Sequence, residues 1–156
     1  MNTITTFLAV IVAFVALQQF LLARERFKLD LFDRRFAIFK ATQVFVNEII
    51  CHRSVSASES STWIQQFSKQ AQTATFLFDD DLSKFLDDLW KKGNVVAVAY
   101  NLWSDPNRGE GAQDAFQKAV KIQEEMIEVQ NHLEERFSKY LKFSNWKYGF
   151  IFGISN

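Results

Sequence analysis

The stretch ITTFLAVIVAFVALQQFLLA, residues 4–23, carries no charged side chain and is followed at once by RERFKLDLFDRRFAIFK, residues 24–40. Twelve of the twenty residues in the first segment are Leu, Ile, Val or Phe. At about 1.5 Å rise per residue, a helix of this length reaches roughly 30 Å, the thickness of a hydrocarbon core. The sequence therefore predicts a transmembrane anchor over residues 1–23.

A buried core helix and a cleaved signal peptide account less well for this apolar run. A buried core helix of the same length would normally show a polar face, and residues 4–23 have almost none. A cleaved signal peptide needs positive charge before the apolar run and small residues at the cleavage site. No Lys or Arg precedes this run, and Leu21, Leu22 and Ala23 make a poor cleavage site. A retained transmembrane helix is the favoured interpretation.

The positive charges near the apolar run all follow it: Arg24, Arg26, Lys28, Arg34, Arg35 and Lys40. Positive charge stays on the cytoplasmic side of a membrane. We therefore expect a single-pass protein of the cell inner membrane, with its N-terminus outside and its C-terminal domain in the cytoplasm. Arg24, Arg26 and Lys28 are candidate membrane-interface residues, because anionic headgroups attract them at about 1 kcal/mol each near the surface.

Small residues recur on one face of the predicted span. Ala9, Ala13 and Ala16 fall at positions i, i+4 and i+7. Small residues on one face let transmembrane helices approach closely, so these three are candidates for a packing face. The alternative is that Ala is simply common in such spans.

The overall composition limits the class of protein. A chain of 156 residues suffices for one modest domain and an anchor. Its formal net charge is zero, which argues against nucleic acid as the main partner. Seventeen Phe against five Gly and one Pro favour long helices over a turn-rich β fold. The single Cys51 cannot form an intramolecular disulfide.

A heptad pattern continues beyond the predicted span. Apolar residues, with one polar exception, recur at alternating spacings of three and four: Leu29, Phe32, Phe36, Phe39, Gln43, Val46 and Ile50. This spacing is typical of a helix seam that packs on another helix of the same chain or on another copy. We expect the first helix to continue from the membrane to about His52, and we expect a homo-oligomer.

The rest of the chain predicts three more helices. The polar stretch 53–61 is a linker, after which Ser60, Ser61 or Thr62 caps a second helix. A third helix starts near Asp79, Asp80 and Asp81 and runs to about Trp103. The loop at 104–111 holds the only Pro, and a last heptad-patterned helix covers about 112–141. The predicted fold is all-α, with a cytoplasmic antiparallel helical bundle over residues 24–142.

The aromatic tail, residues 143–156, has two possible positions. It packs on the bundle, or it returns to the membrane interface, where Trp146 and Tyr148 would be favourable.

Three segments carry a resemblance to known proteins. KLDLFDRRFAIF follows the span, ATFLFDDDLSKFL lies in the middle, and LEERFSKYLKFSNWK lies near the end. In this order they resemble a family of small bacterial membrane-anchored helical proteins that has no settled activity. The resemblance covers most of the chain and implies the same topology and a helical cytoplasmic domain. It implies no catalytic residue.

Few residue constellations suggest chemistry. Glu48 with His52 and Glu128 with His132 are i, i+4 pairs that could bind a metal, but they lie opposite the heptad seams and exceed the Glu-x-x-His spacing of helical di-iron sites by one residue. Asp79–Asp81 could bind Mg²⁺, although acids at a helix start also cap it. Cys51 is expected to be a buried structural cysteine rather than a reactive thiol. We therefore expect no metal and no cofactor.

The sequence thus predicts a membrane-anchored, non-catalytic helical interaction or effector protein. Its expected partners are the lipid bilayer, other copies of itself and a protein at the membrane. The alternative is a signal-gated membrane effector that binds a nucleotide second messenger in antiviral defence and then perturbs the membrane, which predicts a basic pocket at a subunit interface. The basic run 24–40 could bind nucleotide or nucleic acid, but the orientation in the membrane already explains it. An enzyme is a third possibility without a motif to support it.

Overall fold

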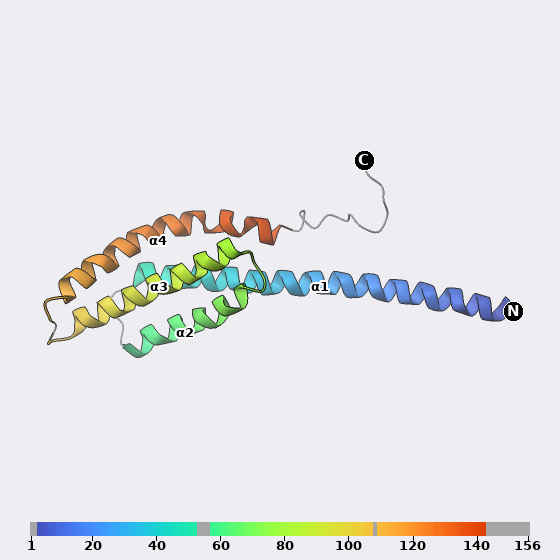
Figure 1. Ribbon diagram of the computed structural model, residues 1–156, viewed down its shortest axis with the longest axis horizontal. Coiled ribbons are helices and arrows are strands. Elements are labelled where there is room, and N and C mark those ends of the chain that lie inside the picture. The colour runs from blue at the N-terminus through green and yellow to red at the C-terminus, as the bar shows by residue number, and fades with distance from the viewer. Residues whose placement is uncertain (1–2, 53–56, 108, 143–156) are drawn as a thin grey trace. The chain divides into compact units, whose positions relative to one another are not determined.

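The computed structural model describes residues 3–52, 57–107 and 109–142, and all the regular structure in these residues is helical. Figure 1 shows the four helices: α1 spans Thr3–Cys51, α2 spans Ala57–Ala74, α3 spans Asp80–Ser104 and α4 spans Ala112–Leu141. The prediction of an all-α protein with one long apolar N-terminal helix is confirmed.

The chain divides into two compact units, Met1–Arg34 and Arg35–Asn156. Within the described residues, the first unit consists of the N-terminal part of α1 alone. The second unit, called the helical unit below, holds the remainder of α1 together with α2, α3 and α4. The sequence pattern places the start of the folded domain at residue 24, whereas the helical unit begins at Arg35.

The helix ends follow from local chemistry. The side chain of Asp79 accepts a hydrogen bond from the backbone N–H of Leu82 at 3.1 Å, so Asp79 is the N-cap of α3, which confirms the capping interpretation. The last helix covers 112–141 as predicted. The expected start of α2 near residues 60–62 is wrong, because the helix already begins at Ala57. Ser and Ala in this stretch are compatible with a helix once the rest of α2 packs.

The core of the helical unit is built from side chains of all four helices, with aromatic rings at its centre. Phe45 of α1 stacks on Phe67 of α2 with ring centroids 3.9 Å apart. The ring centroids of Phe39 in α1 and Phe137 in α4 are 5.2 Å apart. Phe45 and Phe137 are 1% and 0% exposed. Burying each such ring contributes roughly 1.5–3 kcal/mol to the free energy of folding. These ring contacts therefore help to hold α1 against α2 and α4.

One glycine makes this aromatic packing possible. Gly93 is buried in the middle of α3, and a Cβ added there would lie 2.5 Å from Cζ of Phe45 and 3.3 Å from Cζ3 of Trp63. A glycine in a helix interior costs about 0.5–1 kcal/mol relative to Ala. Here the missing side chain provides the space that the two rings fill.

Candidate functional site

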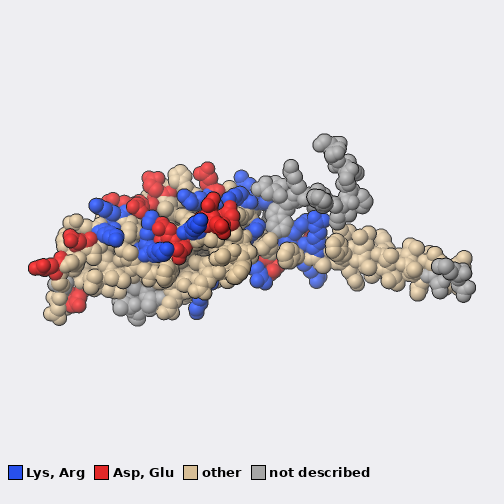
Figure 2. All heavy atoms as spheres, viewed as in Figure 1, with Lys and Arg blue, Asp and Glu red and all other residues tan. Residues whose placement is uncertain are grey.

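The apolar part of α1 is the clearest functional feature of the first unit. An 18-residue window in this helix has a mean hydropathy of 2.2, and none of it is buried against protein. Phe7, Phe14 and Phe20 are 68%, 60% and 59% exposed. In Figure 2 the visible surface of this part of α1 shows no Lys, Arg, Asp or Glu. By length and composition, α1 is the one described helix that could cross a membrane.

The small residues of the span keep their predicted geometry. Ala9, Ala13 and Ala16 lie in α1, and all three are exposed. Their i, i+4, i+7 spacing puts them on one side of a helix. Packing of another transmembrane helix on this side stays a prediction.

The basic block that follows is partly neutralised within the helix. Lys28 Nζ lies 2.8 Å from Glu25 Oε1, and Arg34 Nε lies 2.9 Å from Asp30 Oδ2. Arg24 and Arg26 form no ion pair with a described residue. These two arginines therefore carry the positive charge that a membrane interface would attract.

The predicted seam of α1 has both buried and exposed members. Phe39 and Val46 are buried in the core of the helical unit, at 7% and 0% exposure. Phe36 is 39% exposed and Leu29 is 54% exposed, whereas Phe32 has intermediate exposure. Within one chain, Phe39 and Val46 therefore pack α1 into the core of the helical unit, whereas Phe36 and Leu29 leave apolar surface exposed.

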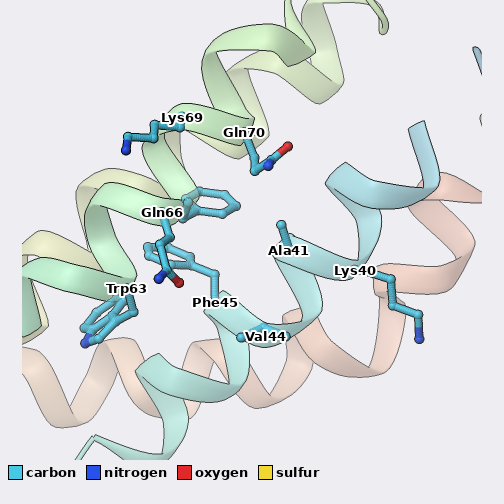
Figure 3. A pocket seen from close by; sticks show the side chains of 9 residues that line it. Lys40, Ala41, Val44, Phe45, Trp63, Gln66, Lys69 and Gln70 are labelled. Carbon is cyan, nitrogen blue, oxygen red and sulfur yellow. The ribbon is translucent and has the colours of Figure 1, made fainter. Parts of the chain in front are cut away.

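A groove lies between α1 and α2 in the helical unit, and Figure 3 shows it from close by. Its volume is about 440 Å³. We call it the α1–α2 groove, and its lining is Lys40, Ala41, Val44, Phe45, Trp63, Gln66, Phe67, Lys69 and Gln70. Among the side chains that the structure describes, the lining contains cationic, amide, aliphatic and aromatic groups and no carboxylate.

The accessible surface of the groove differs from its floor. Phe45 and Phe67 are 1% and 2% exposed, so their stacked rings support the groove from below. Val44 is 59% exposed. In Figure 3 the side chains of Lys40 and Lys69 extend away from the centre of the groove. The groove therefore offers an apolar surface with lysines at its rim.

A second cluster joins three elements of the helical unit. Nε of Arg35 in α1 donates to the carbonyl oxygen of Leu77 at 3.0 Å, and its guanidinium lies 5.9 Å and 5.8 Å from the ring centres of Phe78 and Tyr140. Desolvation by burial lowers the pKa of Arg35 from its usual value. Arg35 is thus a packing residue that holds the α2–α3 turn and α4 against α1.

An ion pair lies beside this cluster. Nζ of Lys139 is 2.6 Å from Oδ2 of Asp79, which also caps α3. Hydrogen bonds from Lys139, from Tyr140 and from the backbone N–H of Leu82 together lower the pKa of Asp79 to about 2, and the hydrogen bond to Asp79 raises the pKa of Lys139. Both side chains are well exposed, so solvent weakens the contribution of the pair to stability.

The structure corrects the prediction for His52. The heptad spacing predicts that Glu48 and His52 face away from the seam, but His52 is only 2% exposed and lies edge-on to Trp63 and Tyr100 at 5.7 Å and 5.0 Å. The reason is that α1 ends at Cys51, so the helical periodicity does not place His52. Neither ring nitrogen of His52 has a hydrogen-bond partner among the described residues.

The prediction of a buried Cys51 is wrong, because its side chain is exposed. Cys51 occupies the last position of α1, and its Sγ lies 3.7 Å from Oδ1 of Asn47.

The second Glu–His pair is exposed on α4. His132 Nε2 lies 4.0 Å from Glu128 Oε2, and Nδ1 lies 3.7 Å from Glu135 Oε2. His52 is buried in another part of the helical unit, so the two histidines do not form a joint ligand set. The described residues contain no group of three or more His, Cys, Asp or Glu side chains that could hold a metal ion.

The two aromatic residues predicted at the membrane interface, Trp146 and Tyr148, lie outside the described residues. Sequence reasoning missed the α1–α2 groove, because a groove depends on how far apart two helices pack. The sequence does contain two large aromatic residues, Phe45 and Trp63, whose rings lie between α1 and α2 with centroids 5.1 Å apart and help set the distance between these helices.

Comparison with known proteins gave no match to this chain among protein-family models, curated proteins or solved structures. The resemblance noted from the sequence stays a prediction.

Proposed function

We propose that this protein is a membrane-anchored, non-catalytic helical interaction or effector protein that associates with other copies of itself. The observation that carries the proposal is the apolar N-terminal part of α1, which has the length of a bilayer core and no protein covering it. Uncovered apolar surface of this extent is unfavourable in water, and a lipid bilayer would remove it from water.

The proposal places the anchor in the inner membrane, with the N-terminus outside and the helical unit in the cytoplasm. The order of charges supports it, since Arg24 and Arg26 follow the span without ion-pair partners among the described residues. The helical unit has its own core, which supports an antiparallel bundle that presents surfaces to partners. Membership in the family of small membrane-anchored proteins is part of the same proposal.

Deletion of residues 1–23 tests the anchor. The truncated chain should move from the membrane pellet to the soluble fraction and keep most of its helicity, because the core of the helical unit lies beyond residue 34. A truncated chain that stays with the membranes without aggregating would show that another segment binds lipid.

The exposed Cys51 tests the orientation without any added label site. A membrane-impermeant maleimide should label Cys51 in lysed cells and leave it unlabelled in intact spheroplasts. The matched control is Asn2→Cys combined with Cys51→Ala, which moves the single thiol to the other end of the span and should give labelling in intact spheroplasts. The reverse pattern in the two proteins would show that the helical unit faces outward.

The signal-gated alternative requires a ligand site. If the protein is a non-catalytic interaction protein and not a nucleotide-gated effector, nucleotide second messengers should leave the melting temperature of the detergent-solubilised full-length protein the same as without nucleotide. A concentration-dependent rise in melting temperature would favour the alternative.

A further inference from the structure

Two surfaces of the helical unit carry opposite charges that are not matched within the described part of the chain. Lys40 and Lys69 at the rim of the α1–α2 groove form no ion pair with a described carboxylate. On the outer side of α4, Glu128 and Glu135 have side chains that are 76% and 84% exposed. Their near neighbour among the described residues is His132, which attracts them only when it is protonated.

Two contacts fix which parts of α1 and α4 lie at the same level. The ring of Phe39 in α1 contacts the ring of Phe137 in α4, and Ile49 in α1 accepts a hydrogen bond from Gln123 in α4. The two helices therefore run in opposite directions, and residues 128–135 of α4 lie level with about residues 40–47 of α1. The acidic side of α4 is thus level with the groove.

Both surfaces also have exposed apolar side chains. Val44 in the groove is 59% exposed, and Ile127 of α4 is 50% exposed. Ile127 precedes Glu128 by one residue, and Val44 follows Lys40 by one helical turn. Each surface therefore offers an apolar side chain near its unmatched charges, so a contact between the two surfaces would remove apolar area from water as well as pair the charges.

We propose that the α1–α2 groove of one copy holds the outer face of α4, residues 127–135, of a neighbouring copy. Lys40 and Lys69 then face Glu128 and Glu135 of the neighbour, and Val44 meets the apolar part of the same face. The inference rests on the proposed function, because anchors in one membrane make all copies point the same way and keep the two surfaces level. The contact joins two different surfaces, so repeated copies form a ring or an open row.

A second copy fits the groove better than a small aromatic ligand does. A nucleotide base would need an open ring to stack on, yet Phe45 and Phe67 are almost fully buried beneath the groove. The half-buried ring of Trp63 already packs against Phe45 and His52. The rim lysines extend away from the centre of the groove, and Nζ of Lys40 lies 5.5 Å from the centre of the Phe36 ring, so neither ammonium group is directed at a ligand in the centre.

Site-specific cross-linking tests the contact in membranes. Two differently tagged full-length chains, both with Cys51→Ala, carry Val44→Cys and Asn131→Cys respectively; both positions are exposed. When they are co-expressed, a short bis-maleimide should join the two different tags, and each variant expressed alone should give no cross-linked dimer. The matched control replaces Asn131→Cys by Gln117→Cys, which is also exposed on α4 but lies outside the predicted level and should not cross-link.

Charge reversal tests the recognition itself. Lys40→Glu with Lys69→Glu, in the chain that carries Val44→Cys, should abolish the mixed cross-link. Adding Glu128→Lys with Glu135→Lys to the chain that carries Asn131→Cys should restore it. All four side chains are exposed, so circular dichroism should show unchanged helicity. A mixed cross-link that survives the double lysine reversal would overturn the proposed contact.

The outcomes separate this inference from the proposed function. Cross-linking of Val44→Cys to itself would mean that copies pair through like surfaces of α1, which overturns the groove contact and leaves self-association in place. A membrane-bound chain that cross-links in no combination and has a monomeric mass in detergent would overturn both the contact and self-association. A soluble full-length chain would overturn the anchor.

Discussion

The side-chain amide of Gln123 on α4 donates a hydrogen bond to the carbonyl oxygen of Ile49, 2.9 Å away in the last turn of α1. The same nitrogen lies 3.0 Å from the carbonyl oxygen of His52, and the amide oxygen accepts a hydrogen bond from the hydroxyl of Tyr100 on α3 at 3.0 Å. The last carbonyls of a helix have no partner within the helix. One glutamine from another helix therefore caps α1 and joins α1, α3 and α4.

This relationship predicts a specific loss of stability in Gln123→Leu. The change leaves the carbonyls at the end of α1 and the hydroxyl of Tyr100 without their partner, which should cost about 1–3 kcal/mol. Gln130→Leu is the matched control, because Gln130 is the next polar seam position of α4 and is exposed; we expect an effect within about 0.5 kcal/mol. Urea unfolding in mild detergent, followed by circular dichroism, measures both. Equal effects of the two changes would show that the cap contributes nothing.

Gly93→Ala should destabilise the helical unit although alanine favours helices. The helix propensity gains about 1 kcal/mol, but the new Cβ would lie 2.5 Å from Cζ of Phe45, whose ring is held between Phe67 and Trp63. Overpacking of this kind typically costs about 1–3 kcal/mol, so a net loss is expected. Gly111→Ala, where a Cβ meets nothing within 4 Å, should leave the melting temperature unchanged or slightly higher. A higher melting temperature for Gly93→Ala would show that Phe45 has room to move.

His52 should make the stability of the helical unit depend on pH. Desolvation by burial lowers the pKa of His52 in the folded chain, and the nearby Glu48 raises it by a smaller amount. The unfolded chain, with a pKa of about 6.5, then binds a proton more readily than the folded chain. The stability from neutral His52 is therefore present above about pH 6.5 and falls as the pH drops below that value toward the folded pKa.

Replacement of the two histidines checks this. His52→Phe keeps an aromatic ring against Trp63 and Tyr100 and should remove the fall in melting temperature between about pH 7 and 5. His132→Phe, on the exposed side of α4, is the matched control and should retain the part of the fall that His52 contributes. A fall that persists in full in His52→Phe would assign the pH dependence to other groups.

The amino-acid sequence predicts the helices and most of their ends, because periodicity and capping are local properties. It identifies α4 by its heptad spacing, and it identifies the start of α3 by Asp79. It does not predict what depends on how helices pack. The sequence predicts an outward-facing His52 and a buried Cys51, and both predictions are wrong. His52 lies beyond the end of α1, so helical periodicity does not place it, and Cys51 at the last position of α1 faces solvent. The α1–α2 groove depends on the distance between two packed helices, and no local sequence pattern predicts that distance.

The same limit applies to the two phenylalanines of the α1 seam. The heptad spacing treats Phe36 and Phe39 alike, yet Phe39 is 7% exposed and Phe36 is 39% exposed. Phe39 packs on Phe137 of α4, with ring centroids 5.2 Å apart. The ring of Phe36 instead contacts residues of α1 itself, with the Phe39 ring 6.0 Å away and Nζ of Lys40 5.5 Å from its centre.

Phe39→Ala and Phe36→Ala should therefore differ strongly. Removal of the ring of Phe39 leaves a cavity against Phe137, and such a change typically costs about 3–5 kcal/mol. Phe36→Ala removes a ring that is already partly in contact with solvent, so the free energy of unfolding of the helical unit should fall by less than about 1.5 kcal/mol. Urea unfolding of both variants measures the difference, and light scattering in detergent reports the mass of the assembly. If copies cover Phe36, its variant changes the mass more than the stability; a large loss of stability in the Phe36 variant at unchanged mass would show that its ring is a core residue of the single chain.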